Sequence, residues 1–355
     1  MEKEGKVRVL EVSGSAYERG YKYGETCKNL INRMLEEAFY TELKGKWTKD
    51  QLLREAKKFI PFIEDYSPEV AEELRGMADG SGKLYEEIVL INLHEERPYF
   101  EAKRCTAFAV TGNATKNGET YQGQNWDGLE MEWWNGEISL LIKIKRKEGP
   151  DILDYTNPGI LVSAGINSKG ISLSWNTVPR IEPLRKGVPT YLLVAEVLRR
   201  KNIQDALEAV VEAERAGCFN FVITDETEIY DIEATPKDID IMYSTEYIVH
   251  ANHYVSQKFQ SKQIIDKHVL NSIIRHNRLK KLVKTNLGKI DLNICMNFLR
   301  DHVNYPNSIC RHPGEEKDPK LRGLTLDSWV IVPAKKEIWI AHGPPCQSEY
   351  IKYTF

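Results

Sequence analysis

The sequence predicts an α+β protein, an αββα sandwich of two antiparallel sheets flanked by helices, with a helical segment at its N-terminus. Apolar residues follow a helical period up to about residue 104. From Cys105 onward, short strands separated by turn residues arrive at the spacing of a sheet. Two groups of helices then interrupt the strands, and this order favours layers of helix packed on sheet.

The predicted N-terminal helices have recognisable starts. Ser15 and Glu18 have the spacing of a capping box, ahead of a helix that runs to about residue 38. Ser67, Pro68 and Glu69 begin another helix with Pro in its first turn. Shorter helices are expected at 49–60 and 85–93.

The remaining elements follow from alternation and turn signals. The turn signal Asn117-Gly118 joins the first two strands as a hairpin. Strands are expected at 105–111, 120–127, 137–146, 160–164, 171–176, 219–224, 229–234, 239–243, 247–252, 325–332, 337–342 and 350–353. Helices are expected at 190–201, 203–216, 272–283 and 291–303.

Composition excludes several classes of function. The 355 residues carry 49 Lys and Arg against 52 Asp and Glu, a net charge of −3, so no basic excess favours a nucleic acid or an anionic membrane as partner. The start of the chain lacks the charged segment, apolar run and cleavage site of a secretory signal. We therefore expect a cytoplasmic protein.

The six Cys are scattered along the chain without a Cys-x-x-Cys pair. This spacing argues against a disulfide framework and against a thiolate zinc site. His250 and His253 also do not predict a metal site, because residues three apart on a strand face opposite sides. We expect no metal and no cofactor, and a thiol that acts alone.

Cys105 stands where the helical pattern changes to strands, and on position alone it is a buried structural thiol. Further motifs in order and spacing are Gln122-Gly123-Gln124-Asn125-Trp126-Asp127, Ala164-Gly165-Ile166-Asn167 and His250-Ala251-Asn252-His253. With Cys105-Thr106-Ala107-Phe108, this set resembles the acyl-coenzyme A:6-aminopenicillanic acid acyltransferase group of N-terminal nucleophile (Ntn) hydrolases, which is more distantly related to choloylglycine hydrolases. The similarity covers nearly the whole chain.

The resemblance implies an inactive precursor that cleaves itself. Cys105 would attack the carbonyl carbon of Arg104, and hydrolysis of the resulting thioester would release two chains, 1–104 and 105–355. The small chain would be the helical leader and the large chain the catalytic core. The freed α-amine of Cys105, with an ordinary pKa of about 7.7 to 8, would serve as the base for its own thiol.

Other residues of this chain match the family pattern. Asp127 would orient the new α-amine, and Asn252 would donate a side-chain N–H to the oxyanion. Asn176 would be a second pocket residue, and Arg275 would lower the thiol pKa or hold an acidic substrate group. The plain alternatives are a turn cap for Asp127, a turn residue for Asn176 and a solvated helix-face charge for Arg275.

The resemblance implies amide hydrolysis or acyl transfer through an acyl-Cys105 intermediate, on a small acyl amide or acyl thioester. No Gly-rich phosphate cradle for coenzyme A is present, which favours hydrolysis. Trp126 and Trp175 are candidates for an apolar acyl pocket, as are the neighbouring Trp133 and Trp134, or else they are core aromatics. Enzymes of this type often self-associate, which leaves a homo-oligomer open as an alternative to a monomer.

One departure from the family pattern leaves two other functions open. Fungal members carry Gly before the nucleophile, whereas this chain has the bulky Arg104, so cleavage is expected to be slower or absent. An uncleaved chain would be a small-molecule binding protein of the same fold. A thiol enzyme that pairs Cys105 with His250 or His253 would instead work without cleavage.

Overall fold

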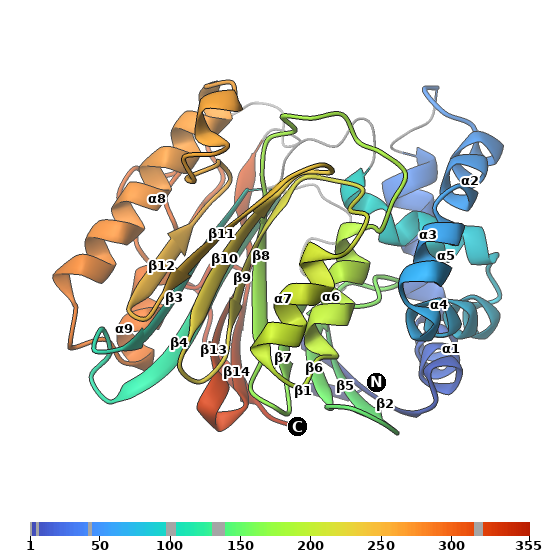
Figure 1. The fold of residues 1–355 in the computed structure, drawn as a ribbon, viewed down its shortest axis with the longest axis horizontal. Coiled ribbons are helices and arrows are strands. Elements are labelled where there is room, and N and C mark those ends of the chain that lie inside the picture. The colour runs from blue at the N-terminus through green and yellow to red at the C-terminus, as the bar shows by residue number, and fades with distance from the viewer. Residues whose placement is uncertain (1, 5–6, 42–44, 97–103, 130–138, 316–321) are drawn as a thin grey trace. The chain divides into compact units, whose positions relative to one another are not determined.

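The computed structural model describes residues 2–4, 7–41, 45–96, 104–129, 139–315 and 322–355 (Figure 1). Across these residues, every helix is too short or too polar to cross a membrane. The chain divides into two compact units. Unit 1 comprises Met1–Phe100, Glu137–Asn167 and Leu184–Gly217, and unit 2 comprises Glu101–Gly136, Ser168–Pro183 and Cys218–Phe355.

Unit 1 contains the N-terminal helices and two later helices. Ser15 caps α1 with the expected capping box, and Ser67 caps α4, which ends at a left-handed Gly82. The helices are α1 (Ala16–Met34), α2 (Lys49–Lys57), α3 (Ile60–Tyr66), α4 (Pro68–Ser81), α5 (Tyr85–Asn92), α6 (Thr190–Leu198) and α7 (Ile203–Val211). A π-helical turn, η1 (Leu35–Thr41), continues α1, and a 3-10 turn, η2 (His94–Glu96), follows α5.

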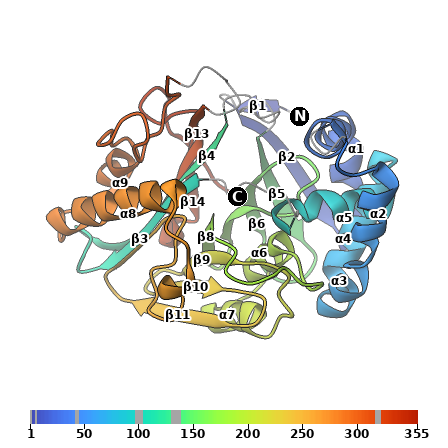
Figure 2. The same ribbon diagram turned by 90° about the horizontal axis from the view of Figure 1, so that it is seen from above.

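Helices α1 and α4 lie side by side and touch through glycines (Figure 2). A Cβ atom built on Gly20 would lie 1.9 Å from the carbonyl oxygen of Glu73, and one built on Gly76 would lie 2.2 Å from that of Tyr17. Beside this contact, the buried Arg19 donates to Glu73 at 2.9 Å, and Arg199, which directly follows α6, donates to the same carboxylate at 2.7 Å. The small residues therefore set how closely the helices pack, and the ion pairs satisfy the charges buried there.

The strands of unit 1 follow the order β1-β2-β5-β6-β7. They are β1 (Glu2–Glu4), β2 (Val7–Gly14), β5 (Leu140–Arg146), β6 (Ile152–Thr156) and β7 (Ala164–Asn167). Pairing is antiparallel except between β2 and β5, which run parallel from Arg8 to Gly14 of β2.

Unit 2 contains two groups of strands that pack face to face. The first has the order β8-β9-β10-β11, and the second has the order β12-β3-β4-β13-β14-β15. The strands are β3 (Arg104–Gly112), β4 (Gly118–Leu129), β8 (Ser172–Thr177), β9 (Phe219–Thr224), β10 (Ile229–Ala234), β11 (Ile239–Ser244), β12 (Tyr247–His250), β13 (Gly323–Val332), β14 (Glu337–His342) and β15 (Ile351–Tyr353).

Helices α8 (Lys267–Thr285) and α9 (Leu292–Leu299) cover the outer face of the second sheet (Figures 1 and 2). Strand β3 shows the alternation that results. Phe108 and Val110 pack with Leu279 of α8 and Phe298 of α9, whereas Ala107 and Ala109 pack with Val222 of the first sheet. Short 3-10 turns lie at η3 (Gln260–Lys262) and η5 (Pro333–Lys335).

The Gln-Gly-Gln-Asn-Trp-Asp motif on β4 joins these layers. The amides of Gln122 and Gln124 each donate at 2.7 Å to a carbonyl oxygen of the first sheet, those of Val222 and Trp175. Asn125 points the other way and donates to the carbonyl oxygens of Leu299 and Ile309. Hydrogen bonds from Gln122, Gln124 and Asn125 thus join the layers, so these three residues of the motif are largely structural.

The predicted fold class is confirmed: the protein is α+β, with two largely antiparallel sheets, helices and a helical N-terminal region. Several elements differ from expectation. The first 104 residues also contain β1 and β2, and the structure adds η1, α3 and β6. Residues 160–163 are not a strand, and α7 ends at Val211, before the expected 216.

Candidate active site

Cys105 is the second residue of β3 and is buried, with 4% of its surface exposed. Its side chain shares a face of β3 with Ala107 and Ala109, so the thiol points into the space between the two sheets of unit 2. The preceding Arg104 begins the strand and pairs with Asp127 of β4. The Arg104–Cys105 peptide bond therefore lies at the start of a paired strand.

Asn252 holds the backbone nitrogen of Cys105. Its Oδ1 accepts from the Cys105 N–H at 2.7 Å and from Nη2 of Arg275 at 2.9 Å. Two donors face this atom, which identifies it as the amide oxygen. The amide nitrogen donates instead to the carbonyl oxygen of Thr177 at 2.9 Å. Asn252 was expected to donate to an oxyanion, but in this structure its N–H groups are used by Thr177.

Arg275 lies on α8 and is 1% exposed. Its Nη1 donates to the carbonyl oxygen of Cys105 at 2.5 Å and also to the hydroxyl of Thr106. One turn earlier, the hydroxyl of Ser272 accepts from the backbone N–H of Asn252 at 2.7 Å. Residues i and i+3 share a helix face. This face of α8 therefore fixes both Cys105 and Asn252, and Arg275 is not a solvated helix-face charge.

Asp127 is fully buried, and its Oδ1 accepts from the hydroxyl of Thr325 at 2.8 Å. Strand alternation places its carboxylate on the face of β4 that Asn125 shares, away from the side of the Cys105 thiol. The side chain of Asn252, by contrast, accepts a hydrogen bond from the Cys105 nitrogen.

Asn176 lies on β8, which packs against β3, and is fully buried. It shares a strand face with Ser174, whose hydroxyl accepts from the indole N–H of Trp329 in the opposite sheet. Neither the amide oxygen nor the amide nitrogen of Asn176 has a hydrogen-bond partner within the described part of the chain. Leaving a buried amide without a partner costs about 1–3 kcal/mol, and this amide faces the space between the two sheets of unit 2.

Two of the candidate pocket tryptophans, Trp126 and Trp175, lie on strands of unit 2. Trp126 pairs directly with Cys105 across β3 and β4, and Trp175 precedes Asn176 on β8; both are half-buried. Trp133 and Trp134 lie outside the described residues.

Both histidines of the His-x-x-His stretch have other partners. Nε2 of His250 lies 2.8 Å from Glu233, and its Nδ1 lies 2.7 Å from the carbonyl oxygen of Ala251. Nδ1 of His253 lies 2.7 Å from Ser272. Burial, and then the charges of His250, His276 and Arg275, lower the pKa of His253 to about 3. Because β12 ends at His250, strand alternation does not apply, and the two rings stack 6.4 Å apart.

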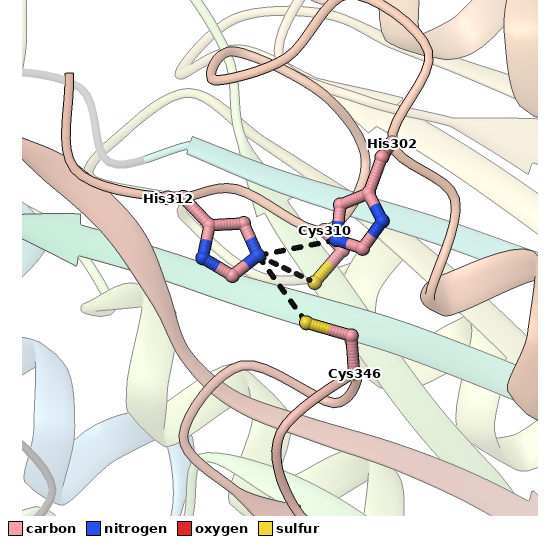
Figure 3. A group of neighbouring side chains, drawn as sticks. All are labelled: His302, Cys310, His312 and Cys346. Atoms are coloured by element: carbon pink, nitrogen blue, oxygen red, sulfur yellow. Dashed lines mark hydrogen bonds between the residues drawn. The ribbon is translucent and has the colours of Figure 1, made fainter.

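The sequence reasoning did not single out one further group. His302, Cys310, His312 and Cys346 bring their ligand atoms within 4.8 Å of one another in unit 2 (Figure 3). In the sequence, only Cys310 and His312 stand close together. His302 lies 8 residues before Cys310, and Cys346 lies 34 residues after His312, so no short motif groups the four.

Residues 113–347 match the family model described as acyl-coenzyme A:6-aminopenicillanic acid acyl-transferase. The acyl-coenzyme A:6-aminopenicillanic-acid-acyltransferase 40 kDa form of Emericella nidulans is 28% identical over 342 residues, which are 94% of this chain and 91% of that protein.

Two solved structures were also matched. A variant of the conjugated bile acid hydrolase of Clostridium perfringens is 12% identical, with a TM-score of 0.47, over 71% of this chain and 97% of that chain. The penicillin V acylase of Agrobacterium tumefaciens is 9% identical, with a TM-score of 0.43, over 67% of this chain and 83% of that chain.

Proposed function

The chain belongs to the acyl-coenzyme A:6-aminopenicillanic acid acyl-transferase family, and from this membership and the contacts of Cys105 we propose that it is a self-cleaving Cys enzyme that breaks acyl amides or transfers their acyl group. The observation that carries the proposal is the 2.7 Å hydrogen bond from the Cys105 N–H to Asn252. It fixes the nitrogen that cleavage would convert from an amide into a free amine.

Cleavage begins when Sγ of Cys105 attacks the carbonyl carbon of Arg104. The C–N bond breaks, the acyl group moves to sulfur as a thioester, and the nitrogen takes up the proton that the thiol loses to become an amine. Water then hydrolyses the thioester, which releases residues 1–104 with a new carboxylate and restores the thiol. Asn252 accepts from the nitrogen at each stage, because both amide and amine carry an N–H.

The mature enzyme uses the same atoms on a substrate. The α-amine accepts the thiol proton, Sγ attacks the acyl carbon, and the amine returns the proton to the leaving group. Water or an acceptor amine then attacks the acyl-Cys105 intermediate, takes the acyl group and releases the thiol. The guanidinium of Arg275 donates to the carbonyl oxygen of Cys105, and we assign its positive charge to favouring the thiolate.

Asn176 is the better candidate for the oxyanion donor. The N–H groups of Asn252 are used by Thr177, whereas the buried amide of Asn176 faces the space between the sheets. We assign Asp127 to orienting the amine once Arg104 has left, since Asp127 pairs with Arg104 across the strands. Trp126 and Trp175 are assigned to the acyl pocket.

Intact mass spectrometry of the purified chain tests this function. We expect two masses that break between Arg104 and Cys105, a single full-length mass for Cys105→Ala, and two masses again for the control Cys218→Ala. A full-length wild-type chain without amidase or acyltransferase activity would favour the small-molecule binding protein instead.

A second measurement tests the alternative in which an uncleaved chain pairs Cys105 with a histidine. His250→Ala and Cys105→Ser are assayed with N-acyl amino acids, acyl amides and acyl thioesters, with and without an acceptor amine. We expect loss of both cleavage and turnover in the Cys105 variant, and the product formed with the acceptor distinguishes transfer from hydrolysis. Turnover by an uncleaved chain that depends on His250 would support the Cys–His pair.

A further inference from the structure

A cluster of two cysteines and two histidines lies in the loops at one end of the second sheet of unit 2. His302, Cys310 and His312 belong to the segment between α9 and β13, and Cys346 belongs to the segment between β14 and β15. Figure 3 shows the four side chains pointing toward one another. This group lies outside the residues that the proposed function uses.

The distances between the ligand atoms fit a tetrahedral metal. Nε2 of His312 lies 3.2 Å from Nε2 of His302, 3.5 Å from Sγ of Cys310 and 3.3 Å from Sγ of Cys346. Zinc bonds of about 2.05 Å to nitrogen and about 2.3 Å to sulfur give tetrahedral edges of about 3.3 Å between two nitrogens and about 3.6 Å between nitrogen and sulfur. The three edges that meet at His312 match within about 0.3 Å, and all four ligand atoms lie within 4.8 Å of one another.

Hydrogen bonds alone do not account for the arrangement. An imidazole nitrogen carries either one proton or one lone pair, so it makes one strong hydrogen bond. Nε2 of His312 nevertheless has three close neighbours, and two of them are thiols, which are weak donors and acceptors. A metal ion at the centre would satisfy all four atoms together.

The backbone that carries these ligands is already fixed. The N–H of Cys310 donates to the carbonyl oxygen of Asp301, and the N–H of His312 donates to that of Pro306. Nε of Arg300 donates to the carbonyl oxygen of Pro345 at 2.9 Å, which joins the two segments next to Cys346. Cys310 and His312 are buried, whereas His302 is exposed, so an ion has a route of entry.

We propose that these four residues form a closed zinc site of the Cys2His2 type that locks the two loops together. Binding deprotonates the two thiols, so each Zn²⁺ that binds releases two protons and forms two bonds to sulfur and two to nitrogen. A tetrahedral set of two sulfurs and two nitrogens is typical of zinc, and four protein ligands leave no position for substrate, which makes the site structural. The sequence did not predict this site, because its two cysteines do not form a Cys-x-x-Cys pair and the four ligands meet only in the folded chain.

The test uses the full-length chain, reduced, stripped with a chelator and reloaded with Zn²⁺ or Co²⁺. We expect one metal ion per chain after desalting, and for Co²⁺ the visible bands and near-ultraviolet charge-transfer bands of a tetrahedral thiolate site. The surface variant His302→Ala and the variant Cys346→Ser should each weaken binding by more than the roughly 10- to 100-fold that loss of an outer hydrogen-bond partner costs.

Variants of two cysteines outside the cluster serve as controls for metal binding. Cys105→Ala and Cys218→Ala should bind the metal like the wild type, and Zn²⁺ should raise the Tm of both, but not that of Cys346→Ser. Three results would each overturn the zinc site. They are less than one ion per folded chain, wild-type affinity for the metal in His302→Ala and Cys346→Ser, and a Cys310–Cys346 disulfide in the reduced preparation.

Discussion

The two buried asparagines near Cys105 differ in what surrounds their amide groups. Asn252 has partners for both atoms, namely Cys105 and Arg275 at its oxygen and Thr177 at its nitrogen. Asn176 has none within the described residues. Asn252 therefore has the contacts of a positioning residue, whereas we propose that the unpartnered amide of Asn176 binds the substrate.

Replacing Asn176 by Ala therefore separates stability from function. The change removes an unpartnered buried amide, so the Tm should stay level or rise, whereas kcat should fall by about 10² to 10³ if the amide donates to the oxyanion. Thermal unfolding and steady-state kinetics on the cleaved enzyme measure the two effects. A large loss of Tm with unchanged kcat would show that Asn176 is structural.

His250, Glu233 and Asp231 form a buried charged group. Burial by itself would lower the pKa of His250, but Asp231 and Glu233 outweigh it and raise that pKa above its usual 6.5. Burial raises the pKa of Asp231 to about 6 despite the nearby His250. The stabilisation from charged His250 is therefore complete below about pH 6.5 and is lost as the pH rises through the folded-state pKa.

The His250→Gln variant tests this sign. Near pH 6 we expect the free energy of unfolding to fall by about 3 kcal/mol, because a buried pair is broken, and the difference from the wild type should shrink toward pH 9. Urea unfolding of both proteins across this range gives the two curves. A difference that stays constant or grows with pH would contradict a charged His250.

At the scale of elements, the contact between α1 and α4 depends on glycine. Gly20 and Gly24 of α1 and Gly76 and Gly80 of α4 each face backbone atoms of the other helix, at 1.9 to 2.2 Å from an added Cβ. Backbone atoms cannot move aside as a flexible side chain does, so the helices would have to separate.

Gly20→Ala should therefore destabilise the protein although Ala is the better helix former. We expect a loss of about 2 kcal/mol or more from overpacking, against a gain of up to about 1 kcal/mol from helix propensity. The control Lys22→Ala, on the exposed face of α1, removes only a surface ion pair with Glu25 and should stay within about 1 kcal/mol. Equal stability of both variants in denaturant unfolding would contradict the close contact.

At the scale of the whole molecule, cleavage after Arg104 would leave unit 1 made of both chains. Strand β2 of the small chain pairs with β5 of the large chain, and Glu73 pairs with Arg199 at 2.7 Å. The hydroxyl of Tyr23 donates to the carbonyl oxygen of Asn157 at 3.0 Å. The small chain would thus be part of a folded core rather than a detachable leader.

We expect the two chains to elute together in native gel filtration and to separate only in denaturant. The buried strand pairing and ion pairs account for this, because dissociation would expose both. Mass analysis of the eluted fractions identifies the chains. A small chain that elutes alone under native conditions would contradict the shared core.

The sequence by itself determined the α+β class and most element positions, because capping residues, turns and alternation act within a few neighbours. It gave β9, β10 and β14 at their observed bounds, but it missed β6, where the buried Asp154 interrupts the apolar pattern. Burial of that carboxylate raises its pKa well above the usual range. Local pattern cannot indicate that a polar residue will be buried.

Motifs in the sequence also selected Cys105, Asn252, Arg275 and Asn176 as site residues, but only the tertiary structure decided what each side chain contacts. Which atom of Asn252 faces Cys105 depends on Arg275, 23 residues away, and on Thr177, 75 residues away. The grouping of Cys310 and His312 with Cys346 depends in the same way on loops from different strands. Hydrogen bonds and metal ligation require atoms to meet within about 3 Å, and chain folding alone sets those distances.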